Sequence, residues 1–182
     1  MATLTHNKAE IADKAAALAA TYEARYRGCG QCVFLAVVDA LRWGGLELMP
    51  EDTEERLFPG TCLFTGGVAF AVDGTCGAVT SSVLVMGMAM ELPREAQDDD
   101  MLRRACALVR DTLLERCYGE YGSILCCDVQ QHYFGGTWDL TDDAASRDFL
   151  AVTDGCAIPQ LSRWATEIIL DEYEKGNMVC PL

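Results

Sequence analysis

The stretch from Leu57 to Met90 contains one charged side chain, Asp73, and is otherwise small and apolar. It must be buried in the folded chain, because exposing it to water is unfavourable. It is interrupted by one proline and several glycines: Pro59, Gly60, Gly66, Gly67, Gly74 and Gly77. A membrane-spanning helix needs an unbroken apolar run, so the pattern predicts protein core and no span. We expect two central small-residue helices hinged at Asp73 and Gly74, with strands over 75–85 as the alternative.

Hydrophobic periodicity predicts helices in the rest of the chain. A helix over 7–27 should start at a capping box formed by Asn7 and Glu10, and a buried helix should follow over 32–43. A short helix after Pro50 should stop at Pro59. Further helices are predicted over 97–118, 144–152 and 159–175, with a break at Cys126, a surface loop over 135–143 and a loose tail over 176–182.

Composition places these helices in one domain. The chain has 182 residues, of which 51% are hydrophobic and 23% are charged, and this suits a single globular core. We therefore predict an all-α, single-domain helical bundle over residues 1–182. The net charge of -14 disfavours nucleic acid and anionic membrane surfaces as partners. The mixed charges before Arg27 do not resemble an export signal, so we expect a cytoplasmic protein.

Cysteine is the residue type that most directly suggests chemistry, since the chain has ten. In a reducing compartment they should be thiols or metal thiolates. Cys29, Cys76 and Cys156 each stand beside a glycine or a predicted helix start, where unpaired amides lower a thiol pKa and bind anions. One of Cys126 and Cys127 could join them. Cys106 and Cys117 lie within a predicted helix, and Cys62 and Cys180 do not stand at a predicted helix start. We therefore interpret these four cysteines as structural or incidental.

Cys29 and Cys32 also form a C-x-x-C pair. This spacing is found in redox dithiols and in metal sites, although no histidine follows to complete a haem-attachment motif. No phosphate loop or hydrolase motif is present. With only two histidines available, His132 is interpreted as a solvated or hydrogen-bonded side chain.

Taken together, these segments resemble the C_GCAxxG_C_C family of redox-active proteins. Residues 28–33 resemble its first cysteine segment, and Gly66-Gly67 followed by residues 76–80 resemble its central motif. Residues 122–126 and Cys156 resemble the third and fourth segments. The sequence departs from the family label where Cys76 precedes Gly77 and where Ser81 replaces the last glycine.

The resemblance implies a site with ligands Cys29, Cys76, Cys126 and Cys156. The motif glycines Gly30, Gly66, Gly67 and Gly77 would surround the cofactor. The family is similar to the cysteine-bearing domain of split-Soret cytochromes c, which implies a helical homodimer, an iron-sulfur site and electron transfer. The haem-binding part of those cytochromes has no counterpart in this chain.

The leading hypothesis is therefore electron transfer through a cysteine-ligated iron-sulfur cluster, of the [2Fe-2S] type, to a redox partner protein that the sequence does not identify. A thiol-disulfide oxidoreductase using Cys29 and Cys32, or Cys126 and Cys127, is the second hypothesis. A structural zinc site in a helical module is the third. Whether the protein is an enzyme is left open.

Overall fold

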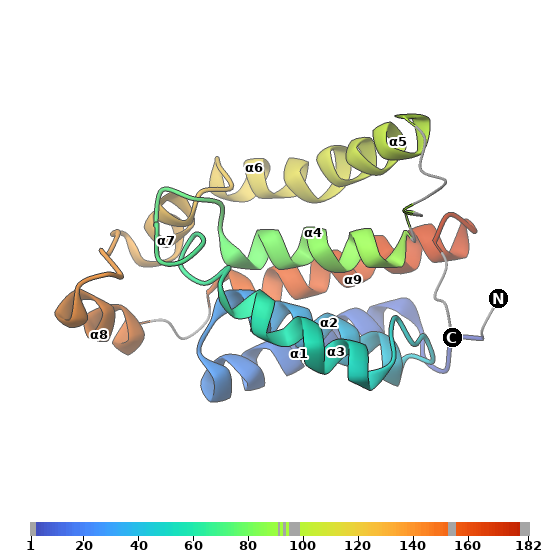
Figure 1. Ribbon diagram of the computed structural model, residues 1–182, viewed down its shortest axis with the longest axis horizontal. Coiled ribbons are helices and arrows are strands. Elements are labelled where there is room, and N and C mark those ends of the chain that lie inside the picture. The colour runs from blue at the N-terminus through green and yellow to red at the C-terminus, as the bar shows by residue number, and fades with distance from the viewer. Residues whose placement is uncertain (1–2, 91, 93, 95–98, 153–155, 179–182) are drawn as a thin grey trace.

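The computed structural model describes residues 3–90, 92, 94, 99–152 and 156–178. Figure 1 shows a helical bundle, and none of the described residues forms an extended strand. The all-α prediction is thereby confirmed. The helices are α1 (Lys8–Tyr26), α2 (Cys29–Trp43), α3 (Glu51–Cys62), α4 (Gly77–Ala89), α5 (Asp99–Val109), α6 (Glu115–Tyr121), α7 (Cys126–Phe134), α8 (Asp143–Val152) and α9 (Ala157–Glu174).

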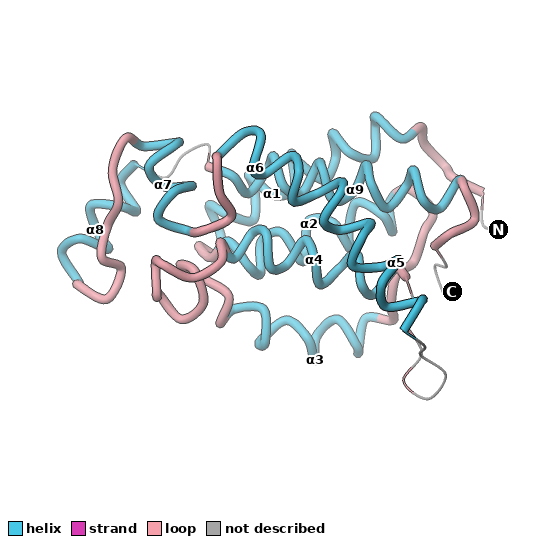
Figure 2. The backbone as a smooth tube through the Cα atoms, turned by 90° about the horizontal axis from the view of Figure 1, so that it is seen from above, coloured by secondary structure: helices cyan, strands magenta, loops and turns pink. Residues whose placement is uncertain are grey.

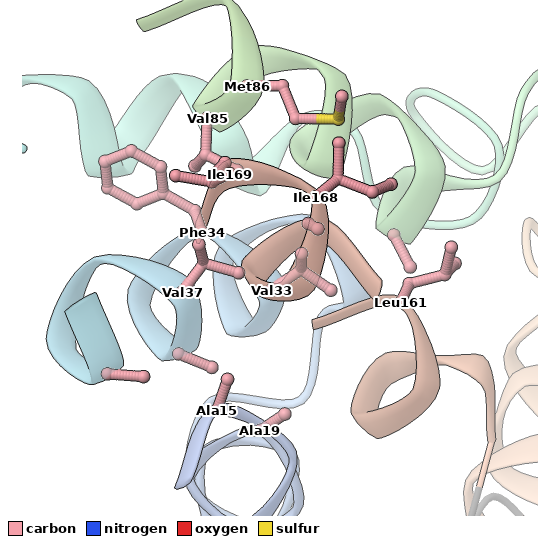
Figure 3. Close-up of a cluster of buried hydrophobic side chains, with 14 of the residues drawn as sticks. Ala15, Ala19, Val33, Phe34, Val37, Val85, Met86, Leu161, Ile168 and Ile169 are labelled. Carbon is pink, nitrogen blue, oxygen red and sulfur yellow. The ribbon is translucent and has the colours of Figure 1, made fainter. Parts of the chain in front are cut away.

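The core lies where α1, α2, α4 and α9 meet. Figure 3 shows side chains of α2 and α9 interlocking beneath α4, with two small residues of α1 closing the other side. These residues are at most 3% exposed: Ala15, Ala19, Val33, Phe34, Val37, Val85, Met86, Leu161, Ile168 and Ile169. Alanines on α1 let it approach α2 and α9 closely, as expected from packing of small residues between helices.

Helix direction decides what gathers at each end of the bundle. In Figures 1 and 2, α2, α4 and α9 all begin at the end that carries α7 and α8. Their first turns, with unpaired amides and partial positive charge, therefore share one end of the molecule. The cysteines singled out in the sequence belong to this end.

Several predicted boundaries are confirmed. Asn7 and Glu10 form the capping box of α1, and α8 begins one residue before its predicted start. Helix α9 begins at Ala157, which places Pro159 in its first turn. The predicted loop over 135–143 is irregular up to residue 142.

Other boundaries were wrong. Pro59 lies inside α3, which continues to Cys62, where the Thr61 hydroxyl donates to the Phe58 carbonyl at 2.7 Å. The predicted helix over 97–118 continues to Tyr121 and contains a π-helical turn, Arg110–Leu114; residues 97 and 98 lie outside the described part. Cys126 does not lie in a break but starts α7.

The largest error concerns the expected pair of central helices. Only the second exists, as α4, and residues 63–76 form successive turns. Glycine-rich sequence permits either outcome, because glycine reaches left-handed backbone conformations as easily as right-handed ones. Among the described helices, none is both long and apolar enough to cross a bilayer.

Ser81, which replaces the last motif glycine, is fully buried on α4, and its Oγ has no hydrogen-bond partner among the described residues. The adjacent Ser82 is equally buried, but its Oγ donates to the Ala78 carbonyl at 2.8 Å. A buried hydroxyl without a partner destabilises a protein, whereas a paired one does not.

We therefore expect Ser81→Ala to raise the free energy of unfolding by about 1 kcal/mol and Ser82→Ala to lower it by about 1 kcal/mol. Urea unfolding followed by circular dichroism measures both. Equal destabilisation by the two substitutions would show that the Ser81 hydroxyl does have a partner.

Candidate functional site

Four cysteines stand at four helix starts around one cavity. Cys29 and Cys126 are the first residues of α2 and α7, and Cys76 and Cys156 are the residues that precede α4 and α9. All four line a cavity of about 600 Å³. The structure thus brings together the side chains that the sequence nominated from segments far apart in the chain.

Backbone pairing holds two of these segments side by side. The Cys76 amide donates to the Ile124 carbonyl at 2.8 Å, and the Cys126 amide donates to the Gly74 carbonyl at 2.9 Å. Thr75 and Leu125 form an antiparallel bridge between them. Cys76 and Cys126 are therefore fixed relative to each other by main-chain bonds, before any side chain contributes.

Glycines allow the remaining close approaches. A Cβ added at Gly77 would lie 2.3 Å from the Phe64 carbonyl oxygen and 2.6 Å from Cys29 Sγ. A Cβ at Gly30 would lie 2.3 Å from the Thr61 carbonyl oxygen, where α2 starts against the end of α3. These two motif glycines are spacers that let backbone segments touch around the thiols.

Gly66 and Gly67 begin a left-handed turn. Five consecutive residues have positive φ angles: Gly66 (64°), Gly67 (77°), Val68 (68°), Ala69 (52°) and Phe70 (64°). For non-glycine residues this conformation costs about 1 kcal/mol each. A Cβ at Gly67 would lie 2.9 Å from the Cys126 Cβ, so this turn is pressed against the start of α7. Strained backbone of this kind is concentrated at functional sites.

Cys29 is the most acidic thiol of the group. It accepts a hydrogen bond from the Cys76 thiol, and the backbone amides of Gly66 and Gly30 also favour its thiolate. These contacts outweigh burial and lower the pKa of Cys29 to about 7. The same hydrogen bond raises the pKa of Cys76, since Cys76 keeps the shared proton. Cys29 is therefore the thiol of the pair that ionises first, while Cys76 keeps its proton.

The other two thiols stay protonated. Burial raises the pKa of Cys126 to about 11, although its sulfur accepts a hydrogen bond from Gln130 Nε2 at 3.4 Å. Burial raises the pKa of Cys156 as well, and the adjacent Glu23 raises it further. Cys156 Sγ donates to Glu23 Oε1 at 2.9 Å.

The remaining described cysteines do not line the cavity. Cys32 and Cys117 are fully buried in the core, and burial raises the pKa of each to about 12. Cys106 is exposed on α5, whereas Cys62 and Cys127 are partly exposed. Cys180 lies outside the described residues. Cys29 therefore faces Cys76, while its C-x-x-C partner Cys32 belongs to the core.

The number and placement of the possible metal ligands decide which kind of metal group could bind here. Within the described part of the chain, no three cysteine, histidine or carboxylate side chains are close enough together to hold one metal ion. A tetrahedral zinc site needs four donors on one ion. A two-iron cluster spreads four thiolates over two ions and needs them arranged around a cavity, next to amide donors. Cys29, Cys76, Cys126 and Cys156 are the thiols of the described chain that line one cavity, so they are the residues that would hold a metal group there.

Sequence reasoning missed two polar neighbours of the thiols. Glu23 lies in the last turn of α1, far along the chain from Cys156, whereas Gln130 follows Cys126 by one turn of α7. The contact of Glu23 with Cys156 arises from packing of α1 beside the start of α9, whereas the contact of Gln130 with Cys126 joins residues four apart on one helix, a spacing that the sequence does offer. His132 pairs with Glu120 at 3.6 Å and does not line the cavity.

A helical bundle with four thiols at the helix starts around one cavity places cysteine sulfur at the centre of whatever chemistry the protein performs. The family whose model matches residues 27–168 carries the description "Putative redox-active protein (C_GCAxxG_C_C)". The match covers most of the chain, and the chain belongs to this family. Searches of curated proteins and of solved structures gave no match.

The contact of Gly77 with Cys29 generates a prediction with a matched control. Gly77→Ala should lower the free energy of unfolding by about 1–3 kcal/mol, because the added methyl group has no room. Gly87, on the same helix, has nothing within 4 Å of an added Cβ. Gly87→Ala should therefore stabilise the protein by about 0.5–1 kcal/mol.

Chemical denaturation gives both values. Mass mapping with iodoacetamide should also show that Gly77→Ala makes Cys29 react faster, because its sulfur is displaced from Cys76 and the cavity wall. Unchanged stability and unchanged Cys29 labelling in Gly77→Ala would contradict the described contact.

Proposed function

We propose that this protein transfers electrons through an iron-sulfur cluster, of the [2Fe-2S] type, held by Cys29, Cys76, Cys126 and Cys156. The observation that carries the proposal is the meeting of these four thiols at one cavity, each at a helix start. When bound, such a cluster accepts and donates single electrons. The membership in a family described as redox-active supports the same conclusion.

The chain's own residues would prepare the ligands. Cysteine binds metal as thiolate, so each thiol must lose its proton when the cluster is inserted. The lowered pKa of Cys29 makes it the thiol that loses its proton most readily, and Glu23 Oε1 accepts a hydrogen bond from the Cys156 thiol. Gln130 holds the Cys126 sulfur in place, and burial of Cys76 and Cys126 limits access of water to these two residues. Amides near the sulfurs would raise the reduction potential by stabilising added negative charge.

Anaerobic preparation from an iron-replete host tests the proposal. We expect about two irons and two acid-labile sulfides per chain, and a paramagnetic signal after reduction by dithionite. Cys76→Ser should lose most of the iron, whereas Cys106→Ser should keep it, because Cys106 is exposed on α5 away from the cavity. A colourless, iron-free protein, or equal iron in both variants, would contradict the proposal.

A second candidate function is thiol-disulfide exchange by Cys29 and Cys76, because these two thiols already share a hydrogen bond. The Cys29 thiolate would attack a disulfide oxidant such as oxidised glutathione, releasing one glutathione thiolate. Cys76 would then lose its proton, attack the mixed disulfide at Cys29 and release the second glutathione. The protein dithiol is oxidised and the glutathione disulfide is reduced to two thiols.

The metal-free protein distinguishes this candidate. The rate of Cys29 alkylation should rise with pH around an apparent pKa of about 7, and Cys76→Ala should move this midpoint upward, because it removes the hydrogen-bond donor. A glutathione redox titration followed by mass mapping should show a reversible Cys29–Cys76 disulfide. A pairing of Cys29 with Cys32, or no disulfide at any potential, would exclude this chemistry for the pair.

We also propose a cytoplasmic location, a homodimer and a redox partner protein. The apolar side chains of Val68 and Phe70 support a docking role for the left-handed turn, since each is 45% exposed beside the cysteine site. The net charge of -14 favours a partner with a basic surface.

A further inference from the structure

Beyond the four thiols, the cavity has a second wall made of apolar side chains. Phe134 of α7, Leu140 of the following loop, and Phe149 and Leu150 of α8 line it. The Phe134 and Phe149 rings meet edge to face, with their centres 5.6 Å apart. Trp138 backs this pair, with its ring centre 5.5 Å from that of Phe149. The wall is therefore largely aromatic and is supplied by α7, α8 and the loop between them.

The size of the cavity exceeds what the thiols and a small cluster require. A two-iron cluster contributes only two iron and two sulfide atoms, whereas the cavity measures about 600 Å³. Cavities of about 300–1,000 Å³ lined mostly by apolar and aromatic groups are typical of sites for small organic molecules. The space between the sulfurs and the aromatic wall is therefore large enough for such a molecule.

The polar groups of the lining differ in availability. Both polar atoms of the Gln130 side chain already have partners, because Nε2 donates to Cys126 Sγ and Oε1 accepts from the Trp138 amide. The Thr65 hydroxyl donates to Gln31 Oε1. Glu23 accepts a hydrogen bond from Cys156. Arg27 lines the cavity and is exposed, and no ion pair involves it among the described residues. It is the cation available to an anionic group.

We propose that this cavity binds a small, flat, largely apolar aromatic molecule that carries one anionic group. Its rings contact Phe134, Leu140 and Phe149, and its anionic group faces Arg27. Helix α8 supplies part of this wall although it buries none of its described residues, and Figure 1 shows it beyond the end of the bundle. A role for this ligand as a small electron acceptor or donor rests on the proposed function; its binding does not.

Titration of the 182-residue chain with 1-anilinonaphthalene-8-sulfonate tests the site, since this probe has a flat naphthalene ring system, is largely apolar and carries one anionic group. We expect saturable fluorescence enhancement with one probe per chain. Leu150→Glu places a negative charge in the wall and should weaken binding at least tenfold. Val152→Glu is the matched control, because Val152 is on the same helix and 45% exposed, against 40% for Leu150, but does not line the cavity. It should leave the affinity within about twofold.

A second variant keeps the proposal testable if Leu150→Glu does not fold. Arg27→Gln should weaken binding of the sulfonate probe about three- to tenfold but leave binding of its uncharged analogue, N-phenyl-1-naphthylamine, unchanged. Absence of saturable binding, or equal effects of Leu150→Glu and Val152→Glu, would overturn the proposal. Iron content is measured on the same samples. A protein that binds the probe but contains no iron would refute the cluster and leave the ligand site standing. A protein that contains iron but does not bind the probe would refute the ligand site and leave the cluster standing.

Discussion

The main-chain pairing between residues 72–76 and 124–127 is the interaction on which the site depends. It consists of amide-to-carbonyl bonds of 2.8 to 2.9 Å and fixes the start of α4 beside the start of α7. Cys76 and Cys126 cannot separate unless these bonds break. Gly77 then lets the start of α4 approach Cys29 on α2, and Cys156 completes the set from α9. The thiols are therefore held by backbone, which is the most rigid support a fold offers to a reactive group.

The sequence predicted most of the fold because the helices carry strong local signals. The capping box at Asn7 and the apolar periodicity of the long helices are properties of short segments. The turns over 63–76 were missed, since small apolar residues and glycines suit a buried helix and a left-handed turn equally well. Pro59 was overvalued as a stop signal, because one missing amide near the end of a helix is tolerated when the chain continues into packed turns.

The cysteine set could be nominated from sequence because helix starts and glycines mark positions where amides favour thiolates. The resemblance to the family then selected Cys126 over its neighbour. The pairing of Cys29 with Cys76, and not with Cys32, could not be predicted in this way. It follows from the direction of side chains on α2, which turns Cys32 into the core while Cys29 faces the cavity. The positions of Glu23 and of the aromatic wall at the cavity could not be predicted from the sequence either, because they result from the packing of helices against one another.

The central claim is that four sulfur atoms from distant segments face one cavity. A crystal structure of the anaerobically purified protein, with sulfur and metal positions located by anomalous scattering, measures this directly. We predict that Cys29, Cys76, Cys126 and Cys156 present their sulfurs to one space, with iron density between them. Sulfurs of these residues turned into the core or to separate surfaces of the molecule would contradict the account.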